Sequence, residues 1–168
     1  VSRQQAYAKS SSAERCALGE LMDDALLLAR NSHHQRSVEV VKAFAPAPDV
    51  YVDRHRVLQI LVNLITNALQ ALNDCERPDK RLVAHIGVTP DQFVRLAIED
   101  NGVGIAPEYA ARLFQHGFTT RPNGHGFGLH NSALTAQELG GVLRFESPGR
   151  GLGATFILEL PMTRSGLW

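Results

Sequence analysis

The most regular pattern of apolar positions lies near the middle of the chain, between residues 54 and 75. Aliphatic side chains recur there every three or four positions, the spacing that places them on one broad face of a helix. They are Val57, Leu58, Leu61, Leu64, Ile65, Ala68, Leu69 and Leu72. Asp53 suits the N-cap, because its carboxylate can accept a hydrogen bond from a free N–H of the first turn. The pattern predicts a long helix with one face buried.

Three further helices are predicted from shorter segments. Residues 18–32 carry apolar side chains at helical spacing, and residues 127–139 end at a pair of glycines, which is typical of a helix C-terminus. Pro107 suits the first turn of a short helix that continues to residue 114.

Segments rich in β-branched and alternating apolar residues predict the strands. They cover residues 37–44, 81–90, 92–100, 142–148 and 153–161. The second and third should pair antiparallel across a short turn, and the last two should form a hairpin. Because most of these strands pair with a sequence neighbour, we predict an α+β fold, a two-layer α/β sandwich. Its sheet should be mixed and mostly antiparallel, with the helices on one face.

Composition is that of an ordinary cytosolic globular domain. Of the 168 residues 44% are hydrophobic and 20% charged, enough for one buried core. Seventeen basic residues balance seventeen acidic ones, so nothing indicates a nucleic-acid or membrane footprint. No apolar run approaches the ~18 residues of a membrane span. Cys16 and Cys75 lie far apart and indicate neither a disulfide framework nor a zinc site.

Several common catalytic motifs are absent from the sequence. There is no GxxxxGK[ST] loop, no GxGxxG after a first strand, no HExxH and no GxSxG. The usual P-loop, dinucleotide, zinc-protease and serine-hydrolase sites are therefore not indicated. The glycines of the chain need another explanation.

Two amides stand one turn apart on the long predicted helix. Asn63 and Asn67 lie at i and i+4, on the same face as large aliphatic residues. Half-buried amides need partners, and an amide oxygen is an acceptable ligand for Mg²⁺. Bonds to neighbouring backbone or solvent would explain them equally well at this point.

A carboxylate and two glycines follow the third predicted strand. Asp100 precedes Gly102 and Gly104, and an ionised carboxylate at this position would select a ligand with an amino group, such as adenine. The glycines would let a flat ring approach the backbone. An Asx turn that needs glycines at positive φ is the alternative.

A second glycine-rich segment opens the predicted helix at residues 127–139. Gly124, Gly126 and Gly128 occur within it, at a position where free N–H groups and the helix dipole favour anions. Thr119 and Thr120 precede it and can add hydroxyl contacts. A flexible linker would explain this segment equally well by itself.

Together and in this order, these pieces resemble the N, G1, F and G2 boxes of the ATP-binding catalytic domain of sensor histidine kinases. The boxes are LVNLITNALQAL (61–72), EDNGVGI (99–105), LFQHGFTT (113–120) and GHGFGLH (124–130). The domain belongs to the GHKL superfamily, which includes DNA gyrase, heat-shock chaperone ATPases and mismatch-repair proteins. The resemblance covers residues 18–161 and implies a Bergerat-type ATP-binding fold, with ATP and Mg²⁺ as cofactors.

The resemblance implies a role for each box. Asp100 would contact the adenine amino group, directly and through a water shared with Thr155. Asn67 would coordinate Mg²⁺, and Asn63 stands where hydrolytic relatives carry a Glu that activates water. Asn63 and Asn67 are the expected catalytic pair. The expected ATP contacts are Asn63, Asn67, Asp100, Gly102, Gly104, Ile105, Phe118, Thr119, Thr120, Gly124, His125, Gly126, Phe127, Gly128, Leu129 and Thr155.

The sequence departs from the family pattern at Gln70. Many members carry a basic residue three positions after the metal-binding Asn, and Arg121 or His125 could replace its charge here. A metal cluster of His116, His125 and His130 is a weaker reading, because their spacing is irregular.

The resemblance also implies an organisation and partners. Residues 1–17 would be the remnant of a dimerisation helix and its linker, residues 18–163 the catalytic domain and residues 164–168 a tail. No phosphoacceptor motif (His-Glu/Asp followed by Pro) occurs. The expected partners are ATP, the phosphoacceptor hairpin of the same protein and a response regulator, but no nucleic acid.

We expect the chain itself to be a monomeric cytoplasmic domain. The full protein would be a homodimer, and it could be anchored in the inner membrane. Two other functions stay open: a GHKL ATPase that hydrolyses ATP, and a nucleotide-sensing or docking module without transfer activity.

Overall fold

The computed structural model describes residues 13–32, 37–115 and 128–162. Its helices are α2 (Leu18–Ser32), α3 (Arg54–Asn73), α4 (Pro107–Ala110) and α5 (Gly128–Glu138). Its strands are β1 (Ala13–Cys16), β2 (Glu39–Phe44), β3 (Val50–Asp53), β4 (Arg81–Val88), β5 (Phe93–Asp100), β6 (Val142–Glu146) and β7 (Ala154–Pro161). In these described parts, no helix combines the length and apolarity that a membrane crossing requires.

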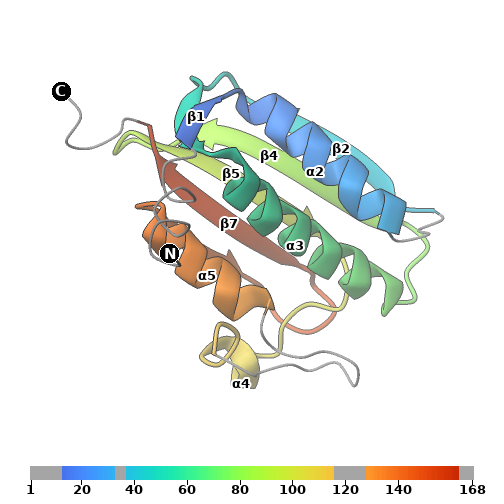
Figure 1. Ribbon diagram of the computed structural model, residues 1–168. Helices are drawn as coiled ribbons and strands as arrows, with labels where there is room; N and C mark the ends of the chain where they lie inside the picture. The colour runs from blue at the N-terminus through green and yellow to red at the C-terminus, as the bar shows by residue number, and fades with distance from the viewer. Residues whose placement is uncertain (1–12, 33–36, 116–127, 163–168) are drawn as a thin grey trace, which may run out of the picture.

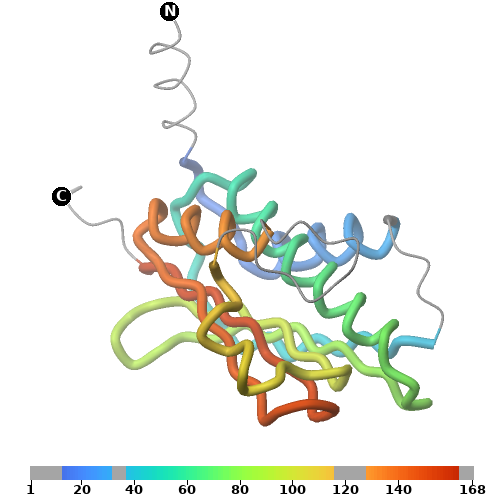
Figure 2. The backbone as a smooth tube through the Cα atoms, turned by 90° about the horizontal axis from the view of Figure 1, so that it is seen from below, coloured from blue at the N-terminus to red at the C-terminus, as the bar shows by residue number. Residues whose placement is uncertain are grey.

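The larger of two sheets has five strands in the order β2-β4-β5-β7-β6. Strand β2 runs parallel to β4, and the other neighbours are antiparallel. Helices α2, α3 and α5 cover one face of this sheet, as Figure 1 shows, and Figure 2 shows the helix layer and the sheet as separate layers. The predicted two-layer α+β fold with a mostly antiparallel sheet is confirmed.

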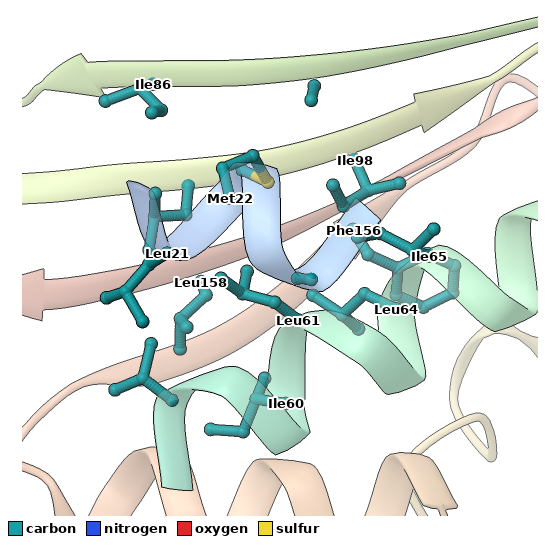
Figure 3. Close-up of a cluster of buried hydrophobic side chains, with 14 of the residues drawn as sticks. Leu21, Met22, Ile60, Leu61, Leu64, Ile65, Ile86, Ile98, Phe156 and Leu158 are labelled. Carbon is teal, nitrogen blue, oxygen red and sulfur yellow. The ribbon is translucent and has the colours of Figure 1, made fainter. Parts of the chain in front are cut away.

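The core lies between the sheet and the helices. Helix α3 begins as predicted, with the Asp53 carboxylate accepting a hydrogen bond from the Arg56 N–H. Leu61 and Leu64 of α3 are fully buried, and Figure 3 shows them beside Leu21 of α2 and Leu158 of β7. Burying each such side chain contributes roughly 1.5–3 kcal/mol, which is why this apolar face fixes the position of α3.

The opposite face of the sheet, which we call the open face, carries charged side chains above a small apolar centre. Glu99 of β5 is paired there with His85 of β4 at 2.8 Å. Ala97 and Ile157 pair across β5 and β7, and both are buried outside the main core cluster. The alternation of side chains along a strand explains this division, because consecutive residues point to opposite faces.

A two-stranded antiparallel sheet of β1 and β3 was not predicted. Sequence analysis treated Ala13–Cys16 as part of a linker, but this segment pairs with Val50–Asp53, which leads directly into α3. Four residues are too few for a clear alternating pattern. The strand is recognisable only when its partner is known.

Candidate functional site

The site is centred on Asp100, the last residue of β5, whose side chain points to the helix layer. The side chain is buried, with 5% exposed. Oδ1 accepts a hydrogen bond from the Gly102 N–H at 2.8 Å. Oδ2 is buried and has no hydrogen-bond partner among the described residues. Because a buried carboxylate oxygen normally has a partner, Oδ2 is an acceptor available to a ligand.

Burial also changes the acidity of this carboxyl group. Loss of solvation raises the pKa of Asp100 to about 6, and the nearby charge of Glu99 acts in the same direction. The hydrogen bond from the Gly102 N–H opposes this shift. The group is therefore ionised at neutral pH at a cost in free energy, which a donor from a ligand would reduce.

Residues 100–105, which we call the G1 loop, pack against the C-terminal part of α3. The Val103 N–H donates to the Ala71 carbonyl at 3.3 Å. A Cβ on Gly102 would lie 2.6 Å from the same oxygen, so no larger residue fits there. The hydrogen bond from Gly102 to Asp100 forms the Asx turn that was the alternative interpretation. Only one carboxylate oxygen is used in that turn, so the turn and a ligand contact are compatible.

The predicted amides lie on the side of α3 that faces α5. The Asn63 Nδ2 donates to the Ser132 Oγ at 3.1 Å, and Ser132 is buried. A Cβ on Gly128 would lie 2.8 Å from the Asn63 Oδ1. Asn67, which is half-buried, lies one turn further along the same side of α3. The structure thus brings the N box together with the end of the G2 box.

Gln70, where the family pattern has a basic residue, is engaged elsewhere. Its Nε2 donates to the Asp74 Oδ1 at 3.0 Å, at the C-terminal end of α3. Leu129, in the first turn of α5, packs against the core. His130 follows it, and its Nδ1 hydrogen-bonds to the Phe114 carbonyl at 3.1 Å. This contact joins the start of α5 to the segment after α4.

The expectation for Thr155 is wrong. Ala154 pairs with Asp100 in the register of β5 and β7, whereas Thr155 pairs with Glu99. Because side chains alternate along a strand, Thr155 lies on the open face with Glu99, away from the Asp100 carboxylate. Ala154 is the residue of β7 beside Asp100, and it has no hydroxyl to share a water.

Several predicted site residues lie outside the described residues. They are Phe118, Thr119, Thr120, Gly124, His125, Gly126 and Phe127. His116 and Arg121 fall in the same segment, so the histidine cluster is not tested there. Within the described ranges, no group of three His, Cys, Asp or Glu side chains could hold a metal ion. Sequence analysis missed Ser132, because one serine on an amphipathic helix carries no distinguishing signal.

Comparison with known proteins agrees with this arrangement. The sequence model of the family described as histidine kinase-, DNA gyrase B- and HSP90-like ATPases matches residues 52–164. The chain belongs to this family. Sensor protein FixL of Bradyrhizobium diazoefficiens is 33% identical over 146 residues, which are 86% of this chain and 28% of FixL. Sensor histidine kinase ZraS of Escherichia coli is 30% identical over 86% of this chain and 30% of its own length.

Solved structures of histidine kinases share the family fold. The catalytic domain of ThkA is 25% identical with a TM-score of 0.77, over 90% of this chain and 99% of that domain. Full-length ShkA, solved in complex with AMPPNP, is 25% identical with a TM-score of 0.79, over 93% of this chain and 32% of ShkA. The chain spans less than a third of the length of FixL and of ZraS.

Proposed function

We propose that this chain is the ATP-binding catalytic domain of a two-component sensor histidine kinase. It binds Mg²⁺-ATP and presents the γ-phosphoryl group to a histidine on a dimerisation domain of the full protein. The observation that carries the proposal is the buried Asp100 carboxylate, whose Oδ2 has no partner among the described residues. The relatives named as sensor kinases, and the ShkA complex with AMPPNP, support the same assignment.

Recognition of the base rests on Asp100. An ionised carboxylate only accepts hydrogen bonds, so its Oδ2 selects the exocyclic amine of adenine over the carbonyl that guanine carries at that position. Binding of this donor favours the ionised form of Asp100 and offsets the cost of its burial. Gly102 and Gly104 keep the adjacent backbone free of side chains, so a flat ring can approach it.

The phosphate end of the nucleotide rests on α3. The half-buried Asn67 amide oxygen suits Mg²⁺, which needs few protein ligands because it retains waters and binds phosphate oxygens. When bound, Mg²⁺ would neutralise part of the triphosphate charge. We assign Gly128 and Leu129 to the same end of the site, together with the predicted residues of segment 116–127.

Asn63 favours transfer over hydrolysis. The hydrolytic relatives use a Glu at this position as the base, whereas an amide cannot take a proton from water. The hydrogen bond from Asn63 to Ser132 fixes the amide against α5. Catalysis would therefore rest on positioning and charge stabilisation, and the acceptor imidazole would come from the dimerisation domain.

The partners follow from this reaction. The phosphoryl group would pass from the histidine to an aspartate of a response regulator. We expect the chain alone to be a monomeric cytoplasmic domain and the full protein to be a homodimer.

Calorimetric titration tests the proposal. ADP and a non-hydrolysable ATP analogue would be titrated, with and without Mg²⁺, into the wild type, Asp100→Asn and Glu99→Gln. The wild type and Glu99→Gln should bind within about twofold of each other, while Asp100→Asn should lose at least about 100-fold in affinity, because an unpaired donor replaces an acceptor. A folded wild type that binds neither nucleotide would refute the proposal and favour a docking module.

Turnover separates transfer from hydrolysis. The isolated chain should hydrolyse ATP at a negligible rate and should phosphorylate the dimerisation hairpin when that hairpin is added. Rapid steady-state hydrolysis without the hairpin would instead identify an ATPase. Binding of ATP without any phosphohistidine would identify a nucleotide sensor.

A further inference from the structure

The G1 loop is held by the connection between β6 and β7, residues 147–153, which we call the hairpin loop. The Gly151 N–H donates to the Val103 carbonyl at 2.6 Å. The Gly153 N–H donates to the Gly102 carbonyl at 3.2 Å. The two loops therefore meet backbone to backbone, although about fifty residues separate them in the sequence.

The approach of the two loops is close enough to require glycine on both sides. Gly153 has a φ of +77°, and a Cβ there would lie 2.1 Å from the Asp100 carbonyl oxygen. A Cβ on Gly104 would lie 2.0 Å from the Gly149 carbonyl oxygen, at a φ of +72°. Such contacts transmit a shift of one loop to the other, because neither backbone can move without a clash.

One side chain, Ser147, joins the two loops. Its Oγ accepts a hydrogen bond from the Ile105 N–H at 3.1 Å and donates to the Gly153 carbonyl at 2.7 Å. It also accepts from the Gly149 N–H at 3.3 Å. A hydroxyl has one donor and two acceptor lone pairs, so these three bonds use its whole capacity.

We propose that Ser147 is a positioning residue for base recognition. It touches no nucleotide; it fixes the end of the G1 loop at Ile105 and the hairpin loop at Gly153, and so holds the backbone on both sides of Asp100. The consequence for affinity rests on the proposed function, whereas the consequence for the loop does not. Without the hydroxyl, the Ile105 N–H loses its partner and the loop can leave the geometry that places Asp100 under the base.

The experiment compares Ser147→Ala and Ser147→Thr with Thr89→Ala as the matched control. Thr89 plays the same local part at the other end of β5, where its Oγ1 accepts a hydrogen bond from the Phe93 N–H at 3.0 Å. Ser147→Ala should lower the affinity for ADP about tenfold, the size expected when a buried N–H loses its bond. Ser147→Thr, which keeps the hydroxyl, and Thr89→Ala should both bind ADP within about twofold of the wild type.

The factor should be equal for ADP and for a non-hydrolysable ATP analogue, because Ser147 acts on the base and not on the phosphates. Amide hydrogen exchange on the nucleotide-free protein gives an independent test. Exchange at Ile105 should accelerate in Ser147→Ala and stay unchanged in Thr89→Ala. If the wild type binds no nucleotide, the proposed function fails, while the exchange result still decides whether Ser147 holds the loop.

The proposal is overturned if Ser147→Ala keeps both the wild-type affinity and the wild-type exchange at Ile105. It is also overturned if Ser147→Thr fails to restore them while melting at the wild-type temperature. Should Ser147→Ala not fold, Ser147→Cys replaces it, since a thiol has similar size but bonds weakly. In that case Ser147→Cys must bind ADP more weakly than Ser147→Thr for the proposal to stand.

Discussion

The two faces of the five-stranded sheet use carboxylates in opposite ways. Glu99 and Asp100 are consecutive residues of β5, and the alternation of the strand sends them to different faces. On the open face, Glu99 is 45% exposed and pairs with His85. On the helix face, Asp100 is buried with one oxygen unpaired. One charge is paired and remains in water, and the other is unpaired and removed from it.

The difference identifies which group can bind a ligand strongly. An exposed pair gains little from a further partner, because water already solvates it. A buried, half-satisfied carboxylate gains much, because the ligand supplies a hydrogen bond that neither water nor protein provides. The protein therefore accepts a local loss of stability at Asp100 in the nucleotide-free state, as functional sites often do.

The largest effect on stability should come from the helix face itself. Leu158 of β7 is fully buried among the side chains of the core, as Figure 3 shows. Leu158→Ala should lower the free energy of unfolding by about 4 kcal/mol, because helices on one side and the sheet on the other leave a cavity that cannot collapse. Urea denaturation followed by circular dichroism measures it. A loss below about 2 kcal/mol would mean that this face is loosely packed.

The next effect is the pH dependence of stability at Asp100. Its pKa is about 6 in the folded protein, above the ordinary value of 3.8, so ionisation costs folding free energy. The stability from this group is complete below about pH 4 and is lost as the pH rises through 6. Two pKa units correspond to about 3 kcal/mol.

Asp100→Asn removes this titration. The variant should match the wild type near pH 4 and exceed its stability by about 3 kcal/mol at pH 7, in urea denaturation without nucleotide. Glu99→Gln is the control and should keep the wild-type pH profile. A constant difference between Asp100→Asn and the wild type from pH 4 to 7.5 would contradict the assignment.

A smaller effect is expected for Ile157, the buried neighbour of Leu158 on the open face. It pairs with Ala97 of β5 and Arg144 of β6 and is fully buried. Ile157→Ala should lower the free energy of unfolding by about 1.5 kcal/mol, because flexible charged side chains can close over the gap. If Ile157→Ala costs as much as Leu158→Ala, the open face is packed as tightly as the core and the comparison fails.

The smallest effect belongs to the pair on the open face. Removing it by His85→Ala should change the free energy of unfolding by less than about 0.5 kcal/mol, since both side chains are more than a third exposed. The effect should shrink further in 1 M salt. A loss above about 1.5 kcal/mol that persists in salt would show that this pair stabilises the sheet as a buried contact would.

Much of the site could be predicted because its residues occur in short, continuous segments. Asp100 with its two glycines and Asn63 with Asn67 are recognisable from spacing alone, and the structure brings the N box, the G1 loop and Gly128 together. Thr155 could not be placed in the same way. A shift of one residue in strand register reverses the face, and nothing in the sequence fixes the register of β7 against β5.

The sequence by itself determined the helices, the paired strands and the class of site, because hydrophobic period and glycine-rich motifs are local properties. Only the tertiary structure decided which atoms meet. It showed that β1 needs β3 and that Ala154 lies beside Asp100 while Thr155 does not. It also showed that Ser147 reaches the G1 loop from the opposite side of the sequence motif. Burial and hydrogen-bond partners depend on long-range packing, and that is where the character of Asp100 originates.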